Sequence, residues 1–348
     1  HPFWFWNGEM SEEEIRRQYD EMADKGVGGV FICARQGLTI PYLSRRWFDK
    51  VRFAVEEAKK RNMHVWLYDE YPYPSGIAGG EVTLRHPEAK HYTLEHTTKR
   101  VQGGTLFSQE LPWARILYAK AVPVGPEGKK RWDEAIDVGK WIGNYQTEQV
   151  FQKTGLTDYN DKRYFSYRPV QKIEWPVPEG EWELIIVQEK EVEDFKYYAT
   201  YVDPLNEEAM ETFIRVTHDR FAEELGDYFG TTIKGMFTDE TGFLGSIPWS
   251  PRILPYFKEK YGYDLRDHMH ALLYREAEDS PRIRYDYFQA VHELLLNNYH
   301  RRMSEWCEKH GLLYVTEVPS MRITTQTYSH VPGGDTAHEK VGRSLEWI

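Results

Sequence analysis

Residues 66–76 read WLYDEYPYPSG, an apolar run of strand length that ends in an Asp-Glu pair and then enters a turn-rich loop. Residues 235–242 read GMFTDETG and repeat the arrangement with Asp239 and Glu240. Parallel β/α folds place acid–base groups in a cleft in this way, because buried strands present them at their C-terminal ends. Aromatic residues crowd both stretches. Together they predict a parallel β/α fold and suggest a carbohydrate-processing enzyme.

Strands and helices alternate on both sides of residues 66–76. Ser11 and Glu14 form a capping box that predicts the start of one helix, and Gly26 ends it. The alternation of strand and helix patterns predicts a parallel sheet. The strands are expected at residues 3–6, 29–33, 64–68, 233–238 and 312–316, and further helices at about 46–61, 207–225, 251–261 and 284–310.

Residues from about 91 to 200 break this rhythm with short alternating runs between Pro- and Gly-containing turns. We predict that residues 91–200 are a β-rich insertion lobe after the third strand. Residues 1–90 and 201–348 would then form a TIM-type (β/α)₈ barrel segment of about five units. A closed barrel needs eight units. We therefore expect an incomplete barrel in a piece of a longer protein, with an open sheet as the alternative.

Composition narrows the class of partner. The net charge of −11 argues against a nucleic-acid or anionic-membrane partner, and no apolar run is long enough to span a membrane. Cys33 and Cys307 support neither a disulfide framework nor a thiolate metal site. Aromatic residues make up 15% of the chain, which suits either a core or stacking platforms for sugars. The chain starts at His1 and not at Met, so both a cytoplasmic and an exported location stay open. The sequence does not indicate the oligomeric state.

Polar residues follow the expected strands, so they should share one rim of the barrel. Glycoside hydrolysis needs two carboxyl groups that flank the scissile bond, one of them held protonated. We predict Glu240 as the general acid and Glu317 as the second carboxylate. Alternatively, some of these acids pair with Arg35 or Arg322 and hold the rim together. The residues expected to contact a carbohydrate are Trp6, Asn7, Arg35, Asp69, Glu70, Tyr73, Asp239, His330 and Asp335.

Two loops contribute to this list. Residues 71–80 carry Tyr73 and several glycines that let the backbone approach a ligand, and their spacing does not fit a phosphate-binding loop. Residues 330–335 include His330 and Asp335, which we expect to hydrogen-bond a polar ligand. A rival interpretation is a metal-dependent hydrolase, with ligands from Asp69, His330, Asp335 and His338.

Four motifs together resemble a known family. They are FWNG at residues 5–8, WLYDE at 66–70 with PSGIAGG at 74–80, FTDE at 237–240 and HVPGGD at 330–335. They are similar to the catalytic barrel of bacterial α-L-rhamnosidases of glycoside hydrolase family 106 and their relatives. The resemblance covers most of the chain and is weakest in the insertion.

The resemblance implies catalytic Glu residues on the barrel rim, a calcium ion at the sugar site, and longer proteins with further domains. It also favours hydrolysis with inversion. If the family's nucleophile lies on a seventh strand, Glu317 would be a binding residue instead. A carbohydrate-binding barrel without turnover is the remaining alternative.

Overall fold

The computed structural model describes residues 1–146, 150–153, 163–166, 169–195, 200–317 and 323–333. It contains a sheet of six strands in the order β1-β2-β3-β13-β14-β15, and every neighbouring pair is parallel. The strands are β1 (Phe3–Trp6), β2 (Gly29–Ala34), β3 (His64–Tyr68), β13 (Ile233–Asp239), β14 (Leu313–Glu317) and β15 (Val331–Gly333). The first five were expected from the sequence. The sixth, β15, was predicted as part of a ligand-binding loop.

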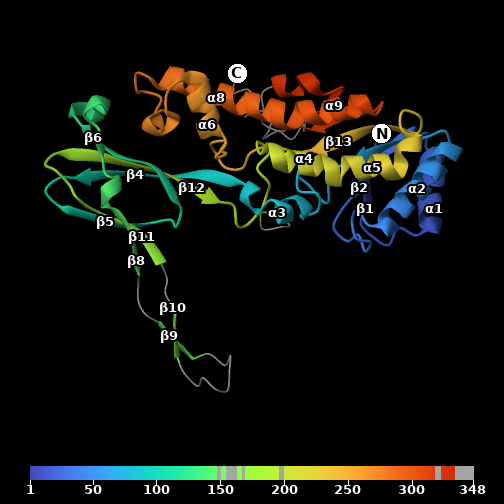
Figure 1. Ribbon diagram of the computed structural model, residues 1–348, viewed down its shortest axis with the longest axis horizontal. Helices are drawn as coiled ribbons and strands as arrows, with labels where there is room; N and C mark the ends of the chain where they lie inside the picture. Colours follow the sequence, from blue (N-terminus) through green and yellow to red (C-terminus); the bar gives the residue numbers. More distant parts are fainter. Residues whose placement is uncertain (147–149, 154–162, 167–168, 196–199, 318–322, 334–348) are drawn as a thin grey trace.

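Helices flank this sheet, and Figure 1 shows α4, α5, α8 and α9 as a layer along one side of it. The Ser11 hydroxyl accepts a hydrogen bond from the Glu14 N–H at 3.2 Å, so the capping box forms. None of the described helices is both long and apolar enough to cross a membrane. The helices are α1 (Glu12–Asp24), α2 (Arg45–Lys60), α3 (Glu81–Arg85), α4 (Glu207–Val216), α5 (His218–Leu225), α6 (Ile253–Tyr261), α7 (His270–Leu273), α8 (Ser280–Leu295) and α9 (Arg301–Lys309).

The architecture is therefore a mixed α/β fold. Among the described strands, β1 and β15 are the two edges of the parallel sheet, so a complete barrel is not reached. The remaining strands of the described chain lie in antiparallel sheets.

The two faces of the parallel sheet differ, because successive side chains of a strand point to opposite faces. Trp6, Leu67 and Met236 are fully buried or nearly so on the face that belongs to the main core. The opposite face is aromatic and partly open, and Phe5 keeps 50% of its surface exposed. We call it the aromatic face; it carries Phe3, Phe5, Phe31, Trp66, Tyr68 and Phe237.

Gly235 lets the aromatic face pack. The Trp66 ring lies directly against this glycine, and a Cβ at position 235 would sit 2.6 Å from Trp66 Cζ3 and 2.3 Å from the Leu313 carbonyl oxygen. Real Cβ atoms do not approach backbone oxygens so closely, so only glycine fits.

The β-rich part between β3 and α4 lies at the opposite end of Figure 1 from α1 and α2. Its central strand β12 pairs with β4 and β6, and β11 pairs with β5 and β8. The strands are β4 (Tyr92–Gln102), β5 (Leu106–Leu111), β6 (Arg115–Val124), β7 (Ile136–Asp137), β8 (Ile142–Gln146), β9 (Val150–Lys153), β10 (Arg163–Ser166), β11 (Pro169–Pro176) and β12 (Glu181–Glu191).

Strand β12 joins the two parts through packing. Leu184 and Ile186 belong to a second hydrophobic core within the β-rich part, whereas Ile185 and Val187 belong to the main core. Because these four residues are buried on alternating faces, the β-rich part is docked onto the α/β part and not merely tethered to it.

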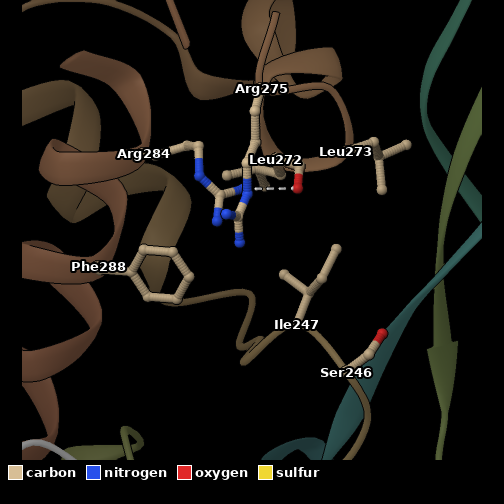
Figure 2. Close-up of a pocket in the computed structure, with 7 residues that line it drawn as sticks. All are labelled: Ser246, Ile247, Leu272, Leu273, Arg275, Arg284 and Phe288. Atoms are coloured by element: carbon tan, nitrogen blue, oxygen red, sulfur yellow. Dashed lines mark hydrogen bonds between the residues drawn. The ribbon is translucent and has the colours of Figure 1, made fainter. Parts of the chain in front are cut away.

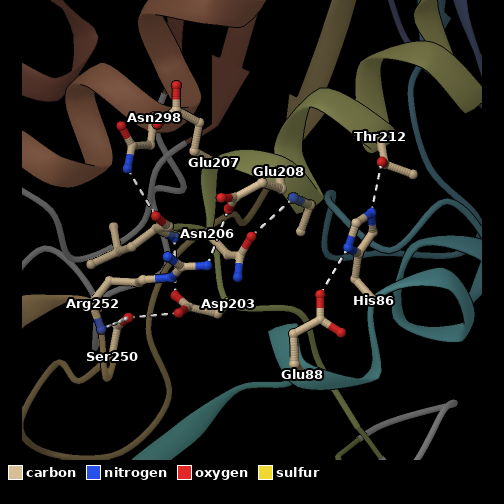
Figure 3. Close-up of polar contacts among 12 residues, drawn as sticks. His86, Glu88, Asp203, Asn206, Glu207, Glu208, Thr212, Ser250, Arg252 and Asn298 are labelled. Carbon is tan, nitrogen blue, oxygen red and sulfur yellow. Dashed lines mark hydrogen bonds and ion pairs between the residues drawn. The ribbon is translucent and has the colours of Figure 1, made fainter.

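A polar network holds the chain where it returns from the β-rich part into α4 (Figure 3). The Ser250 hydroxyl donates to Asp203 Oδ2 at 2.6 Å, and the Asn298 amide donates to the Leu205 carbonyl at 2.8 Å. Both acceptors lie just before α4, so the loop after β13 and the helix pair α8–α9 fix the position of α4.

One helix predicted over residues 207–225 is two helices. The Thr217 hydroxyl donates to the Phe213 carbonyl at 2.6 Å, and Thr217 itself lies between α4 and α5. A threonine hydroxyl that bonds back to the preceding turn commonly bends a helix. The bend places the His218 side chain, which is fully buried, behind β3.

Candidate active site

Three carboxylates meet at the C-terminal ends of β13 and β14. Asp239 and Glu317 are register partners on these adjacent strands, so both side chains leave from the aromatic face. Glu240 follows directly, and one side-chain oxygen from each of the three acids lies within 4.8 Å of the others. The structure therefore brings Glu240 and Glu317 together, with Asp239 beside them. We call these three residues the acid cluster.

The backbone of Glu240 has a left-handed conformation, with φ at 46°. Its N–H donates to the Glu317 carbonyl oxygen at 3.2 Å. A non-glycine residue in this region costs roughly 1–3 kcal/mol and commonly marks a functional constraint. Here the left-handed turn directs Glu240 back toward β14. A continued strand would instead carry Glu240 beyond the end of the sheet.

Asp239 is held by two neighbours on the aromatic face. The Tyr68 hydroxyl donates to Asp239 Oδ2, and Arg35 Nη2 lies 3.4 Å from the same oxygen. The Arg35 guanidinium also donates to the Pro72 carbonyl at 2.5 Å and lies 5.1 Å from the centre of the Tyr73 ring. Charge-assisted bonds and cation–π contacts together fix Arg35 beside the acid cluster.

Tyr68 was not singled out from the sequence. No sequence signal marks it, because its place depends on register: it pairs with Phe237, two residues before Asp239, and therefore faces the same side.

Asp69 lies on the other side of the sheet. It follows Tyr68 directly and is fully buried, with its oxygens accepting hydrogen bonds from Ser75 at 2.5 Å and Thr238 at 2.6 Å. The Ser75 hydroxyl oxygen in turn accepts from the Asp239 N–H at 2.9 Å. Asp69 thus supports the end of β13 from behind and does not open onto the acid cluster.

Asp69 should make the stability of the protein depend on pH. Burial raises the pKa of Asp69 to about 8, above its ordinary value of 3.8. Between these values the folded protein keeps a proton that the unfolded chain releases, so the free energy of unfolding falls as pH rises, by at most about 1.4 kcal/mol per pH unit. Asp69→Asn removes this titration. We expect chemical denaturation to show the variant gaining on the wild type from about pH 5 to about pH 8.

Other buried ionisable groups are common to both proteins and cancel in this comparison. Two parallel pH profiles would contradict a neutral Asp69 in the folded protein.

Glu70 is occupied by its own loop. Its Oε2 accepts the N–H groups of Gly76, Ile77 and Ala78 at 2.7–3.0 Å, and its Oε1 accepts two more. The further donors to Oε1 are the N–H groups of Tyr71 and Gly79, at 2.8 and 2.7 Å. Burial raises the pKa of Glu70 to about 7, while these five N–H groups favour the charged form. Fully buried, Glu70 organises residues 71–79, the loop that carries Tyr73 and the carbonyl bound by Arg35.

The other predicted contacts are spread around the sheet. Trp6 is fully buried on the helix side and packs edge-on against Trp4, with ring centres 5.5 Å apart. Asn7 is exposed just beyond β1. These positions suit packing for Trp6 and leave Asn7 available to solvent.

His330 lies near the start of β14, away from the Glu317 end. Its Nδ1 accepts from the Tyr314 N–H at 2.9 Å, and its Nε2 lies 3.2 Å from Glu308 Oε1. Asp335 and His338 fall outside the described residues. Within the residues that are described, the acid cluster is the group that could hold a metal ion, and neither Asp69 nor His330 belongs to it.

Comparison with known proteins finds a matching family model, and it also finds similar individual proteins. Residues 164–327 match the model of glycoside hydrolase family 106, described as alpha-L-rhamnosidase. A putative beta-glucuronidase from Formosa agariphila is 22% identical over 346 residues, which cover 90% of this chain and 29% of that protein.

A solved structure is similar over the same extent. The rhamnosidase from Novosphingobium sp. PP1Y matches with a TM-score of 0.52 and 15% identity, covering 91% of this chain and 45% of that one. At this identity the match shows a shared fold. The chain spans less than half the length of either relative.

Proposed function

We propose that this chain, which is similar to glycoside hydrolase family 106, cleaves a glycosidic bond with the acid cluster. In this proposal Glu240 is the general acid and Glu317 the second carboxylate. The observation that carries it is the spacing of the cluster, with one oxygen from each acid within 4.8 Å of the others. Two carboxyl groups on one side of the sheet are what hydrolysis of a glycoside requires.

The spacing bears on stereochemistry. Retaining pairs lie about 5–5.5 Å apart, and inverting pairs about 6.5–9.5 Å apart, because an inverting pair leaves room for a water molecule. One oxygen of Glu240 lies within 4.8 Å of one oxygen of Glu317, which is compatible with the retaining spacing, and we propose retention in place of the inversion that the family resemblance implies. In a retaining reaction a Glu317 oxygen would bond to the anomeric carbon as the glycosidic bond breaks and Glu240 protonates the leaving oxygen. Water would then displace the Glu317 oxygen from the anomeric carbon while Glu240 takes the proton of that water.

The substrate we propose first is an α-L-rhamnoside, because the matched family model is described as alpha-L-rhamnosidase and the solved relative as a rhamnosidase. A β-D-glucuronide is the second choice, from the description of the curated relative. Phe5 and Tyr73 offer ring faces beside Arg35, and sugar rings pack their C–H faces on such planes.

The acid cluster is also a chemically suitable calcium site. Calcium takes carboxylate oxygens at about 2.3–2.6 Å, so two ligands on opposite sides of one ion lie about 4.8 Å apart. The oxygens of Asp239, Glu240 and Glu317 meet that limit. Bound calcium would offset the repulsion among the three acids and bind sugar hydroxyls. If these residues hold calcium, the partner of Glu240 lies elsewhere in the protein.

Hydrolysis of 4-nitrophenyl α-L-rhamnoside and 4-nitrophenyl β-D-glucuronide tests the proposal. We expect turnover of at least one substrate, loss of at least about 10²-fold in Glu317→Gln, and NMR detection of the retained anomer as the first product. Each assay is run with added calcium and with a chelator. Binding of rhamnose without turnover would favour a non-catalytic barrel. Release of the inverted anomer, with activity lost on chelation, would transfer Glu317 to a calcium-binding role.

A further inference from the structure

A second polar site lies outside the acid cluster. A pocket of about 230 Å³ opens between the loop after β13 and the helices α7 and α8. Figure 2 shows two arginine side chains reaching into it above apolar neighbours. Its lining residues are Ser246, Ile247, Leu272, Leu273, Arg275, Arg284 and Phe288.

The two guanidinium groups face one another without a compensating acid. Among the described residues, neither Arg275 nor Arg284 makes an ion pair, although the chain holds 55 acidic and 44 basic residues. Burial and the nearby charge of Arg275 lower the pKa of Arg284. Two like charges at one pocket repel each other, and an anion between them would relieve that repulsion.

Arg284 makes two contacts that fix its side chain, whereas no hydrogen bond or ion pair of Arg275 is found among the described residues. Arg284 Nη1 donates to the Leu272 carbonyl at 2.9 Å, and its guanidinium lies 5.5 Å from the centre of the Phe288 ring. These contacts orient Arg284 at the pocket wall. Arg275 is exposed, lines the same pocket, and lies close enough to Arg284 for its charge to act on that guanidinium.

The pocket lies at the same end of the sheet as the acid cluster, beyond the C-terminal ends of the strands. α8, the π-helical turn Leu296–His300 and α9 run on as one helix, which is about 45 Å long. Strand β14 is only about 17 Å long, so the N-terminal half of α8 extends past the rim. Ile247 is seven residues after Glu240, which places the pocket within about 25 Å of that residue.

We propose that this pocket binds an oxyanion group of a carbohydrate, a carboxylate or a sulfate, through Arg275 and Arg284. Arginine is suited to this role because its planar N–H groups match two oxygens of such a group at once. Ile247 and Phe288 would pack against the carbon skeleton beside it. The proposal rests on the proposed function, since it makes the pocket a subsite for an acidic unit of the same substrate.

Binding of sodium D-glucuronate, inorganic sulfate and neutral D-glucose, measured by calorimetry at low ionic strength, tests this subsite. We expect glucuronate or sulfate to bind, glucose not to bind, and Arg275→Ala to weaken the anion at least about 10-fold. Binding of glucuronate alone identifies a carboxylate as the ligand, and binding of sulfate alone identifies a sulfate ester. If neither binds, the proposal is wrong.

Arg282→Ala is the matched control. Arg282 lies on α8, as Arg284 does, but it is outside the pocket. Its guanidinium lies 4.8 Å from the centre of the Tyr263 ring. Its loss should leave anion affinity unchanged. Arg284→Gln is the second test variant, and equal anion affinity in the wild type, Arg275→Ala and Arg284→Gln would overturn the proposal. Because the readout is binding, a protein that binds glucuronate through Arg275 but hydrolyses nothing would reject only the glycosidase function.

Discussion

Replacing Glu240 with glutamine is expected to lower kcat/KM by at least about 10²-fold on a glycoside with a poor leaving group, while the protein stays folded. The amide cannot donate the proton that an alkoxide leaving group needs. The loss should be much smaller on a 4-nitrophenyl glycoside, because its phenolate departs without protonation. Values of kcat/KM on the two substrates, which report the cleavage step and not the later attack of water, measure this difference between wild type and Glu240→Gln.

Glu276→Gln is a suitable control for this experiment. Glu276 is an exposed acid that pairs with Lys130 at 3.0 Å, so its loss should leave turnover unchanged. A Glu240→Gln enzyme that handles the poor leaving group at the wild-type rate would remove Glu240 from the acid role. An equal loss on both substrates would instead indicate that Glu240 acts as a nucleophile or as a calcium ligand.

Replacing Glu70 with alanine is expected to be the most destabilising single change in the site. Five backbone N–H groups lose their acceptor in a fully buried position. Each unsatisfied donor costs about 1–3 kcal/mol, so a loss of more than about 4 kcal/mol in the free energy of unfolding is expected. Hydrogen exchange of the amides of residues 76–79 should accelerate most, because these amides depend directly on Glu70.

Glu70→Gln tests the same contact if the alanine variant does not fold. It keeps one oxygen as an acceptor, so it should be affected less than Glu70→Ala. Glu81→Ala is the control, since Glu81 forms partly exposed ion pairs with Arg85 and Arg220, each of which contributes about 0–1 kcal/mol. Unchanged amide exchange over residues 76–79 in Glu70→Ala would show that the loop holds its shape without the carboxylate.

Local patterns were sufficient to predict the parallel strands and the positions of their acidic ends. The helix cap at Ser11 and the first five strands could be predicted because capping and apolar periodicity are properties of neighbouring residues. By contrast, β15 is three residues long, and its strand conformation comes from pairing with β14. So short a segment carries no periodicity of its own, which is why the sequence indicated only a loop there.

The two Asp-Glu motifs are nearly identical in sequence but have different surroundings. Only the tertiary structure decides which of their acids reach the acid cluster. Asp239 pairs in register with Glu317 and points to the aromatic face, whereas Asp69 points to the helix side. Glu70 is captured by the loop that follows it, while a left-handed turn brings Glu240 back to the acid cluster. Side chains alternate along a strand, so a change of one residue in where the strand ends reverses which acid faces the cleft. The sequence alone determined that five acids stand at strand ends; register and loop conformation, which depend on contacts between distant residues, decided which of them meet.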